Sequence, residues 1–207
     1  MNETPAGVER KLHSLASKVG YGLLLMAFAG YAEQFASPHF ENALWKFQVM
    51  GGLVDNSPML LLALFLVFYE GPNSPSFPFE RHLRRCLSWL CLVLGILFFV
   101  LVPLQALLWL DIDEALGRRS SAEVSKADKL EEQLKNAKPE ARDEYLKQGN
   151  STPEAVRAAA MATWRHQRVT GDVKCFKWSV GALAAGTVCI CIWNASRWTR
   201  RKPRRHP

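Results

Sequence analysis

The feature that most constrains this chain of 207 residues is an uncharged run of 25 residues from Cys86 to Leu110. A helix rises about 1.5 Å per residue, so this run is longer than a hydrocarbon core of about 30 Å. Pro103 lies inside it, and a spanning helix tolerates a proline because neighbouring helices satisfy the carbonyl that the proline frees. Trp89 and Trp109 stand near its two ends, where interfacial aromatic belts are expected. The run predicts a transmembrane helix over residues 86–110.

Three further apolar segments predict that the chain crosses a membrane four times. The expected first span covers about residues 19–36, the second about 53–70 and the fourth about 176–194. Basic residues ahead of the first segment also fit a signal peptide, but a retained anchor fits better because the rest of the chain resembles a multi-spanning protein. We therefore expect an all-α, four-transmembrane-helix integral membrane protein, with three spans in residues 1–110.

The second span raises a question of length, because its uncharged apolar run, Met59–Tyr69, has only 11 residues. A helix of that length does not cross a hydrocarbon core of about 30 Å, so residues before Pro58 must contribute. They form either an interfacial amphipathic helix, with Phe40 and Phe47 on one face, or the first half of one long kinked helix. Ser57 is expected to be the N-cap and Pro58 the first helical residue.

Positive charge is concentrated in short segments beside the apolar runs, and the formal net charge of the chain is +7. These segments are the N-terminus, the 71–85 loop and the tail after the fourth span. Four spans place all three on one side, which the positive-inside rule makes the cytoplasm, so both termini are expected there. Basic residues in such positions meet anionic lipid, and we expect no nucleic-acid partner. The expected topology anchors are Arg81, Arg84, Arg85, Arg200, Arg201 and Lys202.

The segment over residues 111–174 is highly charged but neutral overall, with 12 Lys or Arg and 12 Asp or Glu. After a turn at 117–119, the capping-box pattern of residues 120–123 predicts a new helix, which Pro139 ends. The positions of one face follow a spacing of three to four residues and give a narrow apolar stripe that Glu131 interrupts: Val124, Ala127, Glu131, Leu134 and Ala137 or Lys138.

Thr152 as a cap and Pro153 as the first helical residue predict the start of another helix. We therefore expect an extramembrane helical hairpin between spans three and four, followed by the fourth span and a basic cytoplasmic tail over residues 175–207. The hairpin is either a partner-binding coil or a solvated loop, since its stripe is narrow. As a coil, residues 120–170 bind another membrane protein or a second copy of the chain.

No motif for catalysis, cofactor binding or metal binding stands out. The five histidines are scattered, and the five cysteines lie in or beside apolar runs without metal-ligand or redox spacing. We therefore expect no enzyme activity, no cofactor and no metal. Two carboxylates, Glu33 and Asp55, are expected near the non-cytoplasmic interface. Asp55 either helps to cap the helix that begins at Ser57 or shares a cation or proton site with Glu33.

Small residues recur in the expected fourth span. Two pairs with a spacing of four are formed by Gly181, Ala182, Ala185 and Gly186. Such pairs let helix backbones approach closely in lipid. They are candidate helix-packing positions, although glycine and alanine are also common in spanning helices.

Short motifs follow one another in a characteristic order along the first three spans. They are Tyr31, Glu33, Pro38, Phe40 and Trp45, then Leu53-Val54-Asp55 with Pro58, and finally LVPLQALLWLDID at the end of span three. This series resembles the HpsJ-like proteins, a cyanobacterial membrane-protein family named for hormogonium polysaccharide secretion. Glu33 stands where the family pattern has Asp, and Met59 where it has Leu. The resemblance implies an accessory role in envelope or exopolysaccharide export and carries over no catalytic residue.

Three functions remain open on the sequence alone. The first is a non-enzymatic scaffold of the plasma or thylakoid membrane that assists exopolysaccharide export or envelope assembly. The second is a small transporter or channel that uses Glu33 and Asp55. The third is a subunit or assembly factor of a photosynthetic or respiratory membrane complex.

Overall fold

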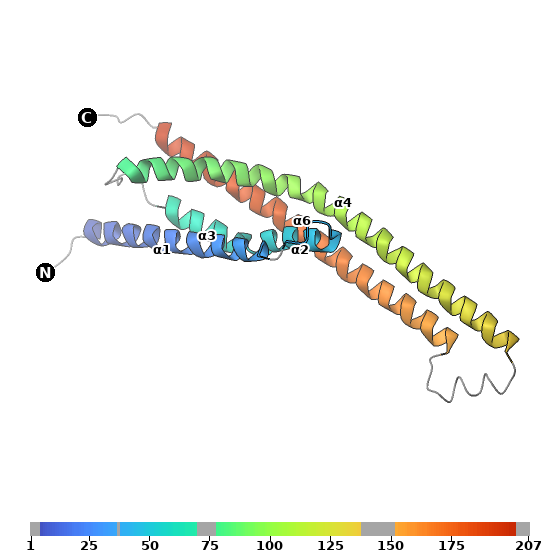
Figure 1. Ribbon diagram of the computed structural model, residues 1–207. Coiled ribbons are helices and arrows are strands. Elements are labelled where there is room, and N and C mark those ends of the chain that lie inside the picture. The colour runs from blue at the N-terminus through green and yellow to red at the C-terminus, as the bar shows by residue number, and fades with distance from the viewer. Residues whose placement is uncertain (1–4, 37, 70–77, 138–151, 202–207) are drawn as a thin grey trace. The chain divides into compact units, whose positions relative to one another are not determined.

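The computed structural model describes residues 5–36, 38–69, 78–137 and 152–201 (Figure 1), and over these residues the chain is helical without any strand. The helices are α1 (Pro5–Gln34), α2 (Ala43–Asp55), α3 (Ser57–Phe68), α4 (Pro78–Asn136) and α6 (Pro153–Arg201). Four stretches are long and apolar enough to cross a membrane: Leu15–Gln34, Ala43–Phe68, His82–Asn136 and Pro153–Arg197. The all-α class and the number of potential spans are therefore as the sequence predicts.

The chain divides into two units. The first comprises residues 1–106 and 176–207, and the second comprises residues 107–175. Both α4 and α6 contribute residues to each unit. With 59 residues, α4 is about 90 Å long at about 1.5 Å per residue, which is far longer than a bilayer core.

In the first unit, α1 packs closely against α3. Their buried contact is made by Leu24 and Ala27 of α1 with Leu60, Ala63, Leu64 and Val67 of α3, and α4 adds Leu87 and Cys91. A Cβ atom placed on Gly20 would lie 2.9 Å from the backbone nitrogen of Val67 and 3.0 Å from the carbonyl oxygen of Ala63, so the backbones of the two helices approach each other closely. Small residues at a crossing point permit such close packing. In lipid, helices associate through this packing because the hydrophobic effect does not drive them together.

Many large apolar side chains of this unit point outward. Among the most exposed are Leu25, Met26, Phe65, Trp89, Val93 and Ile96. A soluble monomer rarely exposes so many large apolar side chains on its helices. Helices of this kind are compatible with insertion into a membrane.

The two halves of the second apolar stretch, α2 and α3, are almost continuous. Only Asn56 separates them, and its backbone stays in the right-handed helical region with φ −85° and ψ −8°. Of the two interpretations offered by the sequence, the structure agrees with one long interrupted helix. The prediction of Ser57 as N-cap is wrong by one residue: Asn56 occupies that position and makes no side-chain capping hydrogen bond, because the chain never leaves helical geometry there.

The second unit is a helical hairpin formed by the end of α4 and the beginning of α6. The predicted turn at 117–119 and the new helix start at 120–123 are wrong, because α4 continues through them. Ser120, the expected cap, is buried within the continuous helix, and the hydroxyl of the next residue, Ser121, donates to the Gly117 carbonyl of the same helix at 2.8 Å. Buried Ile112 and Ala127 keep the same helix in contact with its neighbour on either side of this point.

The start of α6 is as predicted. It begins at Pro153, and the Ala155 backbone N–H donates to Oγ1 of Thr152 at 3.3 Å. Helix α4 ends at Asn136, whereas the predicted stop at Pro139 lies outside the described residues. The limits of the spans inside α4 and α6 stay predictions, since a continuous helix does not mark where a bilayer begins.

Candidate functional site

The clearest polar site of the first unit surrounds Asp55, the last residue of α2. Its carboxylate accepts a hydrogen bond from Nζ of Lys177 at 2.8 Å and another from Nε1 of Trp178 at 2.9 Å. Both donors come from α6. The negative charge is thus balanced by one ammonium group, and one indole N–H fills a further acceptor position.

The shape of α2 makes room for the Trp178 ring. Phe47 meets this ring edge to face, with 5.0 Å between the ring centroids. One turn further along α2, a Cβ atom on Gly51 would overlap the ring, so only glycine fits that position. Trp178 is buried, and its N–H therefore depends on Asp55 for a partner.

The four small residues predicted to pack helices are all buried or half-buried in the first unit. A Cβ on Gly181 would lie 2.7 Å from Cγ1 of Val54, and Ala182 and Ala185 are fully buried. A Cβ on Gly186 would lie 3.0 Å from Cε2 of Phe99. Within the chain, Gly181 therefore lies against α2 and Gly186 against α4.

Glu33, the other carboxylate singled out by the sequence, does not join this site. It is exposed on α1, and among the described residues its carboxylate makes no hydrogen bond or ion pair. The end of α1 instead meets α2 through uncharged groups: the Tyr31 hydroxyl donates to the Leu53 carbonyl at 3.4 Å, and the Gln34 side chain covers Gly52.

The predicted topology anchors are only partly described. Arg84 is half-buried and Arg85 is exposed, both in the early turns of α4. The side chains of Arg81, Arg200 and Arg201, like the whole of Lys202, lie outside what the structure describes. Near the same ends of α4 and α6, the hydroxyls of Ser88 and Ser196 lie 2.6 Å apart.

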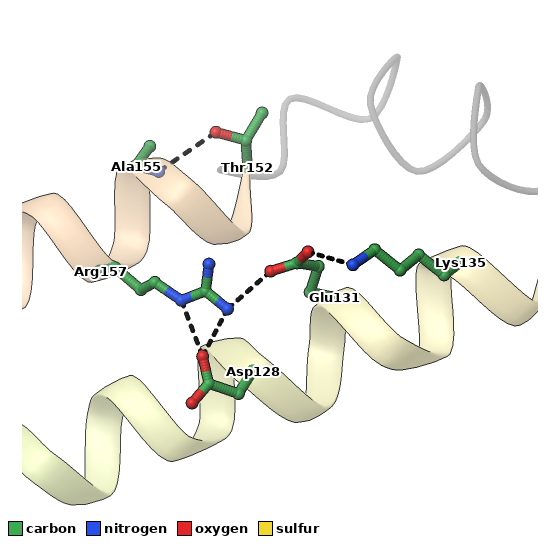
Figure 2. A network of polar contacts seen from close by, with 6 residues as sticks. All are labelled: Asp128, Glu131, Lys135, Thr152, Ala155 and Arg157. Atoms are coloured by element: carbon green, nitrogen blue, oxygen red, sulfur yellow. Dashed lines mark hydrogen bonds and ion pairs between the residues drawn. The ribbon is translucent and has the colours of Figure 1, made fainter.

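The second unit has its own polar cluster, which we name the Arg157 clasp (Figure 2). Arg157 of α6 donates through Nε to Oδ1 of Asp128 at 2.8 Å, through Nη2 to the same oxygen, and through Nη2 to Oε2 of Glu131. Lys135 also reaches Glu131, with 2.6 Å between Nζ and Oε1. The clasp comprises Asp128, Glu131, Lys135 and Arg157.

The charges of the clasp shift the pKa values of Glu131 and Arg157. Hydrogen bonds from Lys135 and then Arg157 lower the pKa of Glu131, and hydrogen bonds to Asp128 and Glu131 raise the pKa of Arg157. Each shift favours the charged form, so the α4–α6 contact is tightest while Glu131 is ionised.

A second polar contact of this unit corrects the expectation for Trp109. Its side chain is 9% exposed, and its Nε1 donates to Oδ1 of Asp172 at 2.7 Å. A Cβ on Gly171 would overlap the Trp109 ring, so the ring packs where Gly171 has no side chain. Trp109 is therefore a packing residue of the hairpin instead of a member of an aromatic belt, whereas Trp89 is 59% exposed.

Comparison with known protein families identifies the chain. The model of the HpsJ-like protein family matches residues 11–173. The chain belongs to this family. The match includes α1 from residue 11 onward, α2, α3, α4 and the beginning of α6, and it confirms the resemblance found in the sequence motifs. No significant match was found among the curated proteins or the solved structures.

Sequence reasoning missed the partners of Asp55 in this HpsJ-like protein. A signal was nevertheless present, since Lys177 is a lone positive charge at the start of the predicted fourth span and Asp55 a lone negative charge at the start of the second. In the expected four-span topology, the second and fourth spans both start at the non-cytoplasmic surface of the membrane, so the two charges are at the same depth. The described residues contain no group of three metal-binding side chains, and the balanced charge of Asp55 makes it a connection between helices.

Proposed function

We propose that this HpsJ-like protein is a non-enzymatic, membrane-inserted scaffold that assists polysaccharide export. The observation that carries the proposal is the length of α4 and α6, each of which combines an apolar stretch with a charged one. A helix of 59 residues is about three times as long as a bilayer core requires. The surplus offers polar helical surface to other components of an export system.

The family match supports the biological part of the proposal. The family is named for hormogonium polysaccharide secretion. On this basis the protein is cyanobacterial and takes part in a process of the cell envelope. Within it, the chain sits in the plasma or thylakoid membrane with both termini in the cytoplasm. The Arg157 clasp then holds together a helical hairpin on the non-cytoplasmic side of the membrane. On that side the hairpin can contact secreted polymer or the machinery that exports it.

The contacts of Asp55 favour a scaffold over a transporter. A cation or proton site built on Glu33 and Asp55 needs both carboxylates near one position. Asp55 instead contacts Lys177 and Trp178, and Glu33 is exposed on α1. The polar groups around Asp55 therefore link helices within the chain and do not bring together the two carboxylates that a cation or proton site would use.

The test is a deletion strain complemented with variants. Export of exopolysaccharide should fall on deletion, return with the wild-type gene and return equally with the double variant Glu33→Gln/Asp55→Asn. Normal export in the deletion strain contradicts the export role, and failure of the inserted double variant to restore export favours the transporter.

A second test identifies the partners of the protein. Purification in gentle detergent should recover components of the export system, and co-migration with a photosynthetic or respiratory complex on native gels contradicts the export role.

The arrangement in the membrane is tested separately. Reporter fusions at residues 45, 78, 145 and 207 should alternate, with 78 and 207 cytoplasmic and 45 and 145 outside. A cytoplasmic reporter at residue 145 would overturn the proposed topology.

A further inference from the structure

Helix α6 has apolar residues on two opposite faces. The inner face packs within the chain and includes buried Ala160, Gly171 and Trp178. The opposite face is exposed: Val169, Val173 and Phe176 expose 62%, 63% and 73% of their surface. The first two belong to the charged part of the chain, where burial in a hydrocarbon core was not predicted.

The exposed residues follow the spacing of a coiled-coil seam. The series, here named the outer seam, consists of Ala159, Ala162, His166, Val169, Val173 and Phe176. Its steps alternate between three and four residues, which places Ala159, His166 and Val173 at a positions and the others at d positions of a heptad. A two-residue stripe per heptad is the narrow face that a second helix covers.

Lipid alone does not account for the middle of this seam. Exposed Arg168, Asp172 and Lys174 stand on the same two helical turns as Val169 and Val173. Charged side chains at that density are costly in a hydrocarbon core. An apolar seam bordered by charges is instead the pattern of a helix that pairs with another helix in water or at an interface.

We propose that the outer seam pairs with the outer seam of a second copy of this chain, forming a parallel twofold dimer. Copies inserted by the same topology signals have the same orientation, so a twofold axis along the membrane normal brings α6 to α6 in parallel and in register. The proposal rests on the proposed function only in taking the chain as membrane-inserted.

Charge complementarity supports this occupant. In a parallel pair, each g residue faces the e residue five positions later in the other helix. Asp172 then faces Lys177 of the second copy, and Arg165 faces Thr170 of the second copy. Asp172 and Lys177 form one pair of opposite charges, no like charges face each other, and the twofold symmetry repeats the pair. Lys177 is well exposed and its ammonium has three donors, so its contact with Asp55 leaves donors for a second carboxylate.

The residue types at the outer seam also fit two parallel helices that pair in a single heptad register. Val173 is β-branched at an a position, which favours two-stranded association. His166 is the polar a residue of the series, and a single polar a residue selects one register at a cost in stability. Slipping the helices by one heptad would bury His166 against Val173 of the other copy.

The test is disulfide cross-linking in native membranes. The background variant carries Cys86→Ser, Cys175→Ala and Cys191→Ser, which leaves only the buried Cys91 and Cys189. Into it are placed Val169→Cys, Val173→Cys or, as matched control, Lys174→Cys, an exposed residue on the same helix away from the seam. Oxidation should produce cross-linked dimers at 169 and 173 in clear excess over 174.

A second measurement guards against loss of folding in the cysteine variants. The wild-type protein in lipid nanodiscs should have twice the mass of one chain, and the double substitution Val169→Glu/Val173→Glu should halve that mass while helix content is retained. A monomeric wild-type protein overturns the proposal, as does equal cross-linking at 174.

Two other occupants of the seam give distinct results. If lipid covers it, a spin label at 169 is reached by oxygen far more than by a water-soluble relaxant, and the protein is monomeric. If another protein covers it, the 169 thiol cross-links to a different chain. Either result contradicts the dimer. Dimerisation together with normal export in a deletion strain would instead leave the dimer standing and remove the export role.

Discussion

Asp55 and Lys177 are 122 positions apart in the sequence, yet the carboxylate of one lies 2.8 Å from the ammonium nitrogen of the other. The contact joins the end of α2 to α6. Trp178, the next residue, donates to the second oxygen of the same carboxylate. One side chain therefore anchors two neighbouring residues of another helix, and changing Asp55 tests the two interactions separately.

Replacing Asp55 should destabilise the protein in two steps. Asp55→Asn removes the charge but keeps an oxygen for the Trp178 N–H, and an exposed ion pair contributes about 1 kcal/mol or less. Asp55→Ala also leaves the buried indole N–H without an acceptor, which costs about 1–3 kcal/mol more. The free energy of unfolding, measured by detergent-induced denaturation, should fall in the order wild type, Asn, Ala.

Glu33→Gln is the matched control, since the Glu33 carboxylate makes no contact among the described residues. It should leave the free energy of unfolding unchanged. A double-mutant cycle of Asp55→Asn with Lys177→Gln should yield a coupling energy of no more than about 1 kcal/mol. Equal stability of the Asn and Ala variants would contradict a role for the Trp178 hydrogen bond.

Much of the architecture follows from the sequence because it depends on local composition. The uncharged run 86–110 and the other apolar segments specify helices that can span a bilayer, and Thr152-Pro153 specifies where α6 begins. The continuity of α4 was not predictable from the pattern of residues 120–123. A serine can cap a helix or bond to a carbonyl four residues back, and the sequence alone does not choose between them.

The site around Asp55 depends on information of another kind. Its partners lie on a distant helix, and which residues meet depends on the register between α2 and α6. That register is determined by packing, through the fit of the Trp178 ring over Gly51 and of Val54 against Gly181. A single sequence shows the charges at one boundary but does not show which atoms meet.

The crossing of α4 and α6 should tolerate no side chain at Gly95. A Cβ there would lie 2.9 Å from Cγ1 of Ile190 and 3.2 Å from the carbonyl oxygen of Gly186. Gly95→Leu should therefore separate the helices and lower the free energy of unfolding by about 1–3 kcal/mol. Detergent denaturation measures the effect.

Gly22→Leu provides the control for that substitution. Gly22 is an exposed helical glycine, and a Cβ there has nothing within 4 Å. The same change in size and helix propensity should then leave stability unchanged or slightly raise it. If both leucine variants are equally stable, the close crossing at Gly95 is refuted.

Arg157→Gln should loosen the hairpin of the second unit without unfolding the first. The glutamine cannot reproduce the charged fork that contacts Asp128 and Glu131. Amide hydrogen exchange should become faster over residues 124–135 and 153–164, while the contact of α1 with α3 keeps its protection. Arg165→Gln is the control, because Arg165 is exposed and makes no ion pair among the described residues; unchanged exchange in Arg157→Gln contradicts the clasp.

Acid should loosen the same hairpin through Glu131. The pKa of Glu131 in the folded protein is lowered below its ordinary value of 4.5, chiefly by the hydrogen bond from Lys135 and then by that from Arg157. A carboxyl group with a lowered pKa stabilises the fold fully above its unfolded value and loses this contribution as pH falls through the folded value. The hairpin should therefore be unaffected between about pH 7 and pH 5 and weaken below the ordinary glutamate range.

Spin labels on Lys129 and Glu154 measure this transition as a change in the distance between α4 and α6. The distance distribution should broaden only in the acidic range in the wild-type protein. In Glu131→Gln, which carries no charge at any pH, the distribution should already be broader at neutral pH and should change less on acidification. A wild-type distribution that broadens between about pH 7 and pH 5 would assign the transition to a group other than Glu131, because a lowered carboxyl pKa lies below that window.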